Sequence, residues 1–132
     1  MAEKLILGIT MGDPAGIGPE ITVKALAKKE IYDECRPLVI GDAAVMEEAA
    51  KIAGREDIKI RAVQSVGEAK YEYGTIDVYD MKLMDLNTLE RGKVSAAAGE
   101  AAFGYVKKVI ELAMAGEIDG TVTNASNKEA VN

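Results

Sequence analysis

The sequence predicts an α/β protein whose mainly parallel β-sheet is flanked by helices. Short apolar runs of strand length alternate along the chain with segments in which apolar residues recur every three or four positions. A loop rich in glycine and proline, "GDPAGIGPE" at 12–20, follows the first apolar run and precedes the first helical segment. Both observations are typical of parallel strands that are joined by crossover helices.

Three apolar runs in the first half of the chain are predicted strands: 4–10, 36–42 and 58–63. The first two are mostly apolar, as expected of buried parallel strands, whereas the third alternates apolar with basic residues and is more typical of a sheet edge. The segments between them are predicted helices, from Pro19 to about Lys29 and over 43–54. Proline suits the first turn of the former helix, and Gly54 is placed to end the latter.

The second half of the chain adds two predicted strands and one long helix. The strands are 75–81, which alternates apolar and polar residues, and 119–126, which runs into a polar turn. The helix ends at Gly116, and its apolar stripe consists of Ala98, Ala102, Tyr105, Val109 and Leu112. Residues 64–93 look irregular, and we interpret them as an excursion away from the main sheet.

The composition is that of a soluble protein, with 48% hydrophobic and 29% charged residues and no apolar run of membrane-spanning length. A net charge of −6 argues against nucleic acid as a partner, because phosphates require a basic surface. The single cysteine excludes an internal disulfide and favours a reducing compartment, so we expect a cytoplasmic protein that contacts no membrane. The sequence contains no histidine, the commonest general base and a common neutral metal ligand.

The glycine-rich loop is the first candidate for a functional site, because ligands of open α/β sheets bind beyond the carboxyl ends of the strands. Its glycines permit positive φ angles and close approach of a ligand, and the following helix offers unpaired N–H groups. Asp13 can accept a hydrogen bond from a hydroxyl or fix its own loop. The loop matches neither the dinucleotide fingerprint, which requires glycine in place of Ile21, nor a P-loop. A tight turn without a ligand is the structural alternative.

Three longer strings carry a resemblance to a known family. "MGDPAGIGPEI" (11–21) resembles the N-terminal signature of the 4-hydroxythreonine-4-phosphate dehydrogenase family, and it looks like a longer version of the "GDGIGPE" string of isocitrate and isopropylmalate dehydrogenases. "GKVSAAAGEAAFGYVKKVIELA" (92–113) and "GTVTNASNKEAVN" (120–132) are similar to later segments of the same family. Asn124 and Ser126 depart from the Ala-Pro of the family's last segment. The similarity spans the chain from end to end.

This resemblance implies the fold of isocitrate and isopropylmalate dehydrogenases, with residues 1–132 as the N-terminal portion of a two-domain subunit and an incomplete sheet. Family members are NAD- or NADP-dependent homodimers that use a divalent cation, such as Zn, Mg or Co. The implied reaction oxidises 4-phosphooxy-threonine in vitamin B6 biosynthesis and is followed by decarboxylation. Relatives that act on 4-phospho-threonate or 4-phospho-erythronate are the alternative.

The resemblance also implies which parts of the site this chain lacks. The family's next landmark, a "GHTE" segment, and its metal- and substrate-binding histidines belong to the portion that follows. We therefore expect no catalytic residue, no metal ligand and no tightly bound cofactor within 1–132, and we expect the chain alone to be inactive.

Six residues are candidates for contact with ligands. Asp13, Gly16 and Gly18 are assigned to a loop that approaches cofactor or substrate, and Lys128, Thr123 and Asn127 are assigned to the side that holds the phosphorylated substrate. Lys128 opens a predicted helix at the end of the chain, and Asn127 is placed to cap it. A solvated lysine, a strand-end hydroxyl and a simple helix cap are the corresponding structural interpretations.

Two other functions remain open from the sequence. One is a self-sufficient flavodoxin-like module that binds a phosphorylated small molecule with the glycine loop alone. The other is a structural or partner-docking domain, which requires an exposed apolar patch.

Overall fold

A computed structural model describes residues 4–85 and 95–123. Within them, five strands form one sheet in the order β3-β4-β2-β1-β5, and every neighbouring pair is parallel. The strands are β1 (Ile6–Thr10), β2 (Arg36–Gly41), β3 (Lys59–Val63), β4 (Thr75–Asp80) and β5 (Gly120–Val122). The helices are α1 (Gly18–Leu26), α2 (Lys29–Glu34), α3 (Ala43–Ile52), α4 (Ala96–Met114) and the short 3₁₀ helix η1 (Val66–Glu68).

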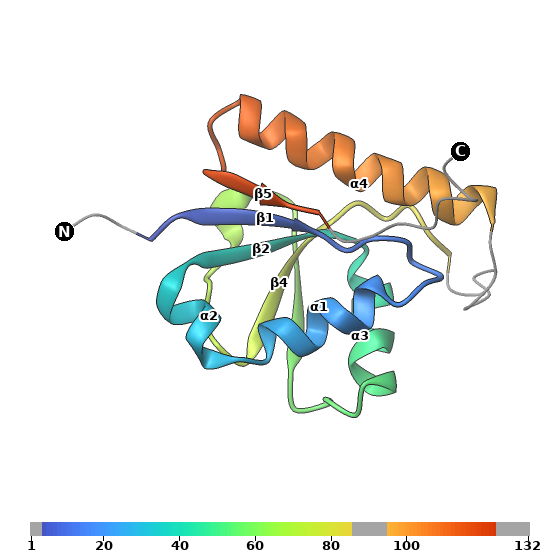
Figure 1. Cartoon of the computed structure of the whole chain (residues 1–132), viewed down its shortest axis with the longest axis horizontal. Helices are drawn as coiled ribbons and strands as arrows, with labels where there is room; N and C mark the ends of the chain where they lie inside the picture. The colour runs from blue at the N-terminus through green and yellow to red at the C-terminus, as the bar shows by residue number, and fades with distance from the viewer. Residues whose placement is uncertain (1–3, 86–94, 124–132) are drawn as a thin grey trace.

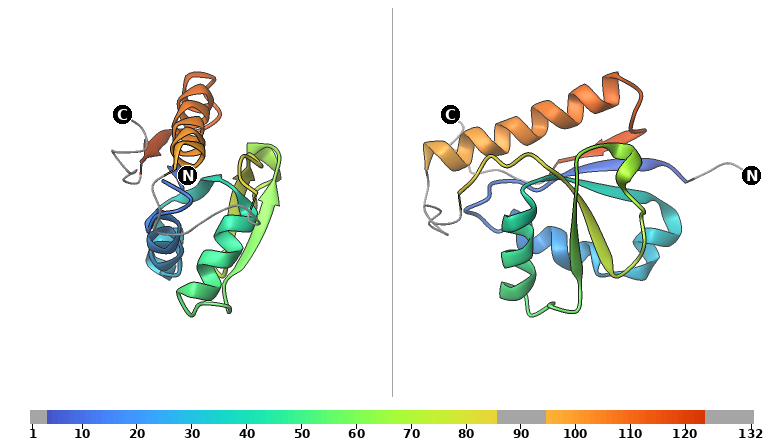
Figure 2. Two further views of the ribbon diagram at one scale, coloured as in Figure 1. Left: turned by 90° about the vertical axis from the view of Figure 1, so that its right-hand side faces the viewer. Right: turned by 180° about the vertical axis from the view of Figure 1, so that it is seen from behind.

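The helices cover the sheet in two layers. α4 lies along one face, whereas α1, α2 and α3 lie on the other (Figures 1 and 2). This three-layer arrangement of a parallel sheet confirms the predicted α/β class. No helix of the described residues has both the length and the apolar character needed to cross a membrane.

The core is centred on β2 and on the inner stripe of α4. Leu38, Val39 and Ile40 of β2 are fully buried, because helices cover both faces of this inner strand. The predicted stripe of α4 is confirmed, since Ala98, Ala102, Tyr105, Val109 and Leu112 are all buried.

The ends of the helices follow local sequence signals. Gly54 and Gly116 adopt φ angles of 71° and 77° just after α3 and α4, which confirms both predicted helix ends. At the start of α4 the Ser95 side chain accepts a hydrogen bond from the backbone N–H of Ala98.

Two predictions about the chain's path need correction. The first helix ends at Leu26, not near Lys29, and a separate helix α2 follows it. The predicted strand at 75–81 is confirmed as β4. This strand contradicts the interpretation of 64–93 as an excursion away from the sheet, because β4 lies inside the sheet between β3 and β2. The polar residue Asp77 obscured this burial. Its carboxylate is buried because backbone N–H groups of Lys70 and Tyr71 donate to it.

Two further predictions lie partly or wholly at the end of the chain. The last strand is confirmed over β5, and the rest of 119–126 extends beyond the described residues. The helix predicted to start at Lys128, with Asn127 as its cap, also lies outside them.

Candidate functional site

The candidate site lies at the carboxyl edge of the sheet, by which we mean the side formed by the C-terminal ends of the parallel strands and not an edge strand. The segments after β1, β2, β4 and β5 meet there. Because all the strands are parallel, the glycine loop, Asp42, residues 81–85 and Thr123 emerge at this one edge. Figure 1 shows α1 and α3 beginning here and the first turns of α4 beside them. This is the position where open α/β sheets bind ligands.

Asp13 holds the glycine loop in shape through its own carboxylate. This buried side chain accepts a hydrogen bond from the backbone N–H of Ala15, with 2.8 Å between the oxygen and nitrogen atoms. The backbone N–H of Gly16 donates to the Asp13 carbonyl at 3.0 Å and closes a turn. The loop-fixing role considered for Asp13 is therefore present, and contact with a ligand remains a prediction.

The three glycines of the loop have different roles. Gly12 adopts a φ angle of 85°, which favours glycine, whereas Gly16 and Gly18 do not have positive φ. A Cβ atom on Gly18 would lie 2.5 Å from the Met11 carbonyl oxygen, so this glycine allows the start of α1 to pack against the loop backbone. A Cβ atom on Gly16 would make only ordinary contacts, the nearest at 3.5 Å with Asp13. The expectation of positive φ holds for Gly12 alone.

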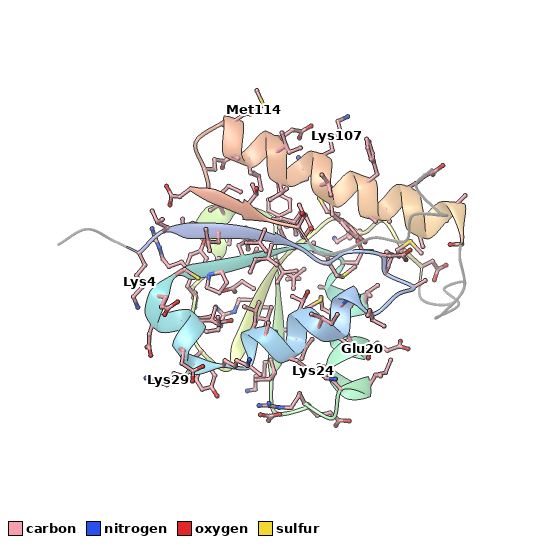
Figure 3. The ribbon with its side chains drawn as sticks, viewed as in Figure 1. Lys4, Glu20, Lys24, Lys29, Lys107 and Met114 are labelled. Carbon is pink, nitrogen blue, oxygen red and sulfur yellow. The ribbon has the colours of Figure 1, made fainter. Side chains whose placement is uncertain are left out.

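The N-terminus of α1 faces the same loop. Its N-cap residue, Ile17, provides no side-chain hydrogen bond, and Pro19 occupies the first turn. The positive end of the helix dipole is therefore left without a capping side chain, although Glu20 places a negative charge in the first turn. Figure 3 shows Glu20 and Lys24 on the outer side of α1, away from the sheet.

Asp42 joins three separate segments at this edge. It occupies the N-cap position of α3, yet its buried carboxylate accepts hydrogen bonds from the backbone N–H of Leu83 at 3.1 Å and of Met84 at 2.7 Å. The hydroxyl of Tyr105 on α4 donates to the same carboxylate at 2.9 Å. The segment after β4 is thereby fastened to both β2 and α4.

Asp80 performs the capping that Asp42 does not. Its carboxylate accepts from the backbone N–H of Ala43 at the start of α3, at 3.2 Å, and from that of Lys82 at 3.3 Å. Sequence reasoning missed this arrangement, because it placed Asp42 at the end of the predicted strand 36–42 and Tyr105 on the apolar stripe of a helix. The available signal was an aspartate at the carboxyl end of each of two inner strands, Asp42 just after β2 and Asp80 as the last residue of β4.

Tyr105 serves this network as a hydrogen-bond donor. Burial raises its pKa far above the ordinary value, and the nearby carboxylates of Asp42, Asp80 and Asp13 raise it further. The phenol therefore stays protonated at physiological pH and donates to Asp42. This is a role in positioning the edge and not in proton transfer.

The structure brings four of the six predicted site residues to one edge. Asp13, Gly16 and Gly18 lie in the loop after β1, and Thr123 follows β5, which pairs with β1 so that Val122 is opposite Ile9. Thr123 is exposed, so its hydroxyl is accessible at this edge. Lys128 and Asn127 lie outside the described residues.

The resemblance implies a divalent cation and a dinucleotide, but the described residues form no binding site that fits either of them. Among them, no group of three histidine, cysteine or acidic side chains is arranged to hold a metal ion. The carboxylates of Asp42 and Asp80 instead accept hydrogen bonds from backbone N–H groups. The glycine loop lacks the third glycine of the dinucleotide fingerprint, and Gly18 packs against Met11. We therefore derive no reaction step that uses the cation or the dinucleotide from these residues.

Comparison with known proteins shows what this chain is similar to. The family model described as "Pyridoxal phosphate biosynthetic protein PdxA" matches residues 33–132. A protein of Symbiobacterium thermophilum with the provisional name D-threonate 4-phosphate dehydrogenase is 49% identical over 131 residues, which are 99% of this chain and 39% of that protein. A protein of Fusobacterium nucleatum with the same provisional name is 48% identical over 125 residues, 95% of this chain and 37% of that protein.

Solved structures agree with these relatives. A 4-hydroxythreonine-4-phosphate dehydrogenase from Burkholderia phymatum superimposes with a TM-score of 0.93 at 48% identity, over 98% of this chain and 39% of that one. A terephthalate 1,2-cis-dihydrodiol dehydrogenase from Burkholderia xenovorans has a TM-score of 0.77 at 29% identity, over 98% of this chain and 37% of that one. The chain thus has the fold of the N-terminal part of these dehydrogenases and spans about two-fifths of their length.

Proposed function

This chain belongs to the family of pyridoxal phosphate biosynthetic protein PdxA, and on that premise we propose that it supplies the N-terminal portion of an NAD- or NADP-dependent, divalent-metal-dependent dehydrogenase. The proposed reaction oxidises the secondary alcohol of a four-carbon hydroxy acid that carries a phosphate on its fourth carbon. The observation that carries this proposal is 49% identity along 99% of the chain to a relative whose name describes such a reaction.

Two substrates fit the names of the relatives. D-threonate 4-phosphate is named for the curated relatives at 49% and 48% identity, and 4-hydroxythreonine-4-phosphate is named for the solved structure at 48% identity. The two acids differ at the second carbon, which carries a hydroxyl in the first and an amino group in the second. Oxidation of the neighbouring alcohol gives a β-keto acid in both cases, and such acids lose carbon dioxide readily. We propose D-threonate 4-phosphate as the substrate and 4-hydroxythreonine-4-phosphate as the second candidate.

We propose that this chain forms one wall of the active site, at the carboxyl edge of its sheet. The glycine loop, held by Asp13, and the segment 81–85, held by Asp42 and Tyr105, form a hydrogen-bonded edge against which a substrate can be positioned. Thr123 offers a hydroxyl at the same edge. The hydride acceptor and the cation are assigned to the portion of the relatives that this chain does not match.

The remaining expectations extend the proposal. We propose that the chain alone does not turn over substrate, because stabilisation of the alkoxide by a metal contributes several kcal/mol, about three or more decades in rate. A homodimer in the cytoplasm is proposed for the assembled enzyme. The rival function is a module that binds a phosphorylated ligand without catalysis.

The test compares the 132-residue chain with a chimera that continues it into the C-terminal portion of the Symbiobacterium relative. Each protein receives NAD or NADP, a divalent cation and one of the two acids, and the formation of reduced cofactor is followed by absorbance. We expect the chimera to turn over substrate and the short chain to be inactive. Turnover by the chimera should be faster with D-threonate 4-phosphate than with 4-hydroxythreonine-4-phosphate. A folded chimera that is inactive with both acids would contradict the dehydrogenase proposal. Stoichiometric binding of either acid to the short chain, without turnover by the chimera, would favour the binding module.

A further inference from the structure

An apolar groove runs beside β1 on the sheet face that carries α1. It has a volume of about 440 Å³, and its floor is formed by Leu7 and Ile9 of β1 and by Leu5 just before this strand. One wall is α1, and the other side opens at Val122 of β5. Parallel sheets in α/β proteins are covered on both faces, so an open apolar floor marks a place that no element of the described residues covers.

The mouth of the groove is exposed apolar surface. The relative exposure is 59% for Leu5, 48% for Ile21 and 45% for Val122. These side chains come from three separate parts of the sequence, and all three line the groove. On the opposite face, by contrast, α4 packs against β1, β2 and β5 and completes that layer. β1 and β5 are therefore covered by α4 on one face of the sheet and line an open groove on the other face.

The length of the relatives indicates what covers the groove. This chain corresponds to the N-terminal part of its relatives and to only 39% of the Symbiobacterium protein. β5 lies at the edge of the sheet, so further strands of a longer chain can pair beside it. The groove adjoins that same edge strand through Val122.

The direction of the crossovers decides which part of a longer chain can reach the groove. Connections between parallel strands are right-handed, so the face that a helix occupies depends on the direction in which the chain crosses the sheet. From β1 to β2 and on to β3 the chain moves one way, with α1, α2 and α3 on the face of the groove. From β4 to β5 it moves the other way, with α4 on the opposite face. A first crossover outward from β5 therefore places its helix beside α4 and leaves the groove open.

We propose that the groove between α1, β1 and β5 seats a helix from the C-terminal portion of the full-length relatives, brought there by a later return of the chain and not by the first crossover after β5. The inference rests on the proposed function only in taking that portion as the natural complement of this chain. It assigns this surface to assembly of the subunit, apart from the candidate site at the carboxyl edge.

Cys35 supplies a reporter for the groove. It lines one end of the groove and is the single cysteine of the sequence. The test measures the reaction of its thiol with Ellman's reagent in the 132-residue chain and in the chimera described above, with the cysteines of the C-terminal portion replaced by serine. We expect the reaction to be slower by about tenfold or more in the chimera, because a seated helix excludes the reagent. This readout needs neither cofactor nor substrate, so an inactive chimera with a protected thiol would contradict the proposed function and leave this inference supported.

The matched control is Lys51→Cys in a Cys35→Ser background. Lys51 is exposed near the end of α3, and the cysteine introduced in its place should react at the same rate in both proteins. A chimera that ends after the first strand–helix–strand unit beyond residue 132 should leave Cys35 as reactive as in the short chain. Protection by that shorter chimera would overturn the assignment to a later return of the chain. Equal reactivity of Cys35 in the short chain and the complete chimera would overturn the proposal as a whole.

A second variant separates seating from misfolding. Ile21→Glu puts a charge at the mouth of the groove, so it should restore fast labelling of Cys35 in the chimera while leaving the cooperative thermal unfolding of the short chain in place. Two outcomes would identify a different occupant and overturn the proposal. One is protection of the short chain that rises with its concentration, which indicates a second copy. The other is an apolar small molecule retained by the purified short chain in native mass spectrometry.

Discussion

The two edges of the sheet differ in chemistry. At one edge, β3 exposes Lys59 and carries Arg61, whose guanidinium lies 3.8 Å from Glu72 and 3.7 Å from Asp77. At the other edge, the three-residue strand β5 exposes Val122 beside an apolar groove. Charges on an edge strand discourage further pairing, whereas an apolar edge invites it. We therefore call β3 the closed edge and β5 the open edge of the described sheet, because charges protect β3 from further pairing and the residues of β5 carry none.

The largest expected effect is in β4, the strand that pairs with the closed edge strand β3. Asp77→Ala should lower the free energy of unfolding by about 3 kcal/mol, because it leaves the N–H groups of Lys70 and Tyr71 unpaired and removes the buried one of the two carboxylates beside Arg61. Urea denaturation of the 132-residue chain measures this. The exposed aspartate Asp57, which pairs with Arg55, is the control, and Asp57→Ala should leave the unfolding curve unchanged. Equal effects of the two variants would show that the closed edge does not depend on its buried carboxylate.

The next effect concerns the loop that leaves β1, the strand beside the open edge. Gly18→Ala should destabilise the chain by about 1–3 kcal/mol, since the new Cβ atom would lie 2.5 Å from the Met11 carbonyl oxygen. Gly16→Ala is the matched control and should change stability by less than about 0.5 kcal/mol. The same denaturation experiment measures both. A stable Gly18→Ala variant would contradict the packing role. If Gly16→Ala impairs turnover of the chimera while leaving stability unchanged, Gly16 contacts a ligand.

A smaller effect compares the surfaces near the two edges directly. Ile21 and Ile52 have nearly the same relative exposure, 48% and 49%, but only Ile21 lines the groove. Ile21→Glu should reduce the fluorescence of the apolar dye ANS with the short chain, whereas Ile52→Glu on α3 should not. Equal loss of fluorescence in both variants would mean that the dye reports general exposure and that the groove has no special affinity for apolar groups.

The smallest effect concerns pH at the end of the groove. Burial raises the pKa of the Cys35 thiol, and the negative charge of Glu34 raises it further. Because the thiolate is the reactive form, labelling of Cys35 should reach half its maximal rate at a higher pH than labelling of the exposed cysteine in Lys51→Cys. Glu34→Gln should move the Cys35 midpoint to lower pH. An unchanged midpoint would show that Glu34 does not act on the thiol.

Local patterns in the sequence determined the elements and the family. Apolar runs and three- to four-residue periods predicted the strands and helices, since both depend on residues close together in the chain. Gly54 and Gly116 marked helix ends for the same reason, because a positive φ angle is a property of one residue. The glycine-rich string was long enough to resemble one family, and the comparisons confirmed that resemblance.

Only the tertiary structure decided which side chains act on which partners. Asp42 has the local signature of a helix cap, yet its carboxylate bonds to Leu83, Met84 and Tyr105, which lie 41, 42 and 63 positions away. Gly16 and Gly18 look alike in the sequence, but a distance to the Met11 carbonyl separates them. The polar residue Asp77 concealed an inner strand, because its hydrogen bonds form only when the chain between 70 and 77 folds back. These contacts depend on positions in space that no local period records, so they become visible only once the strands are ordered in the sheet.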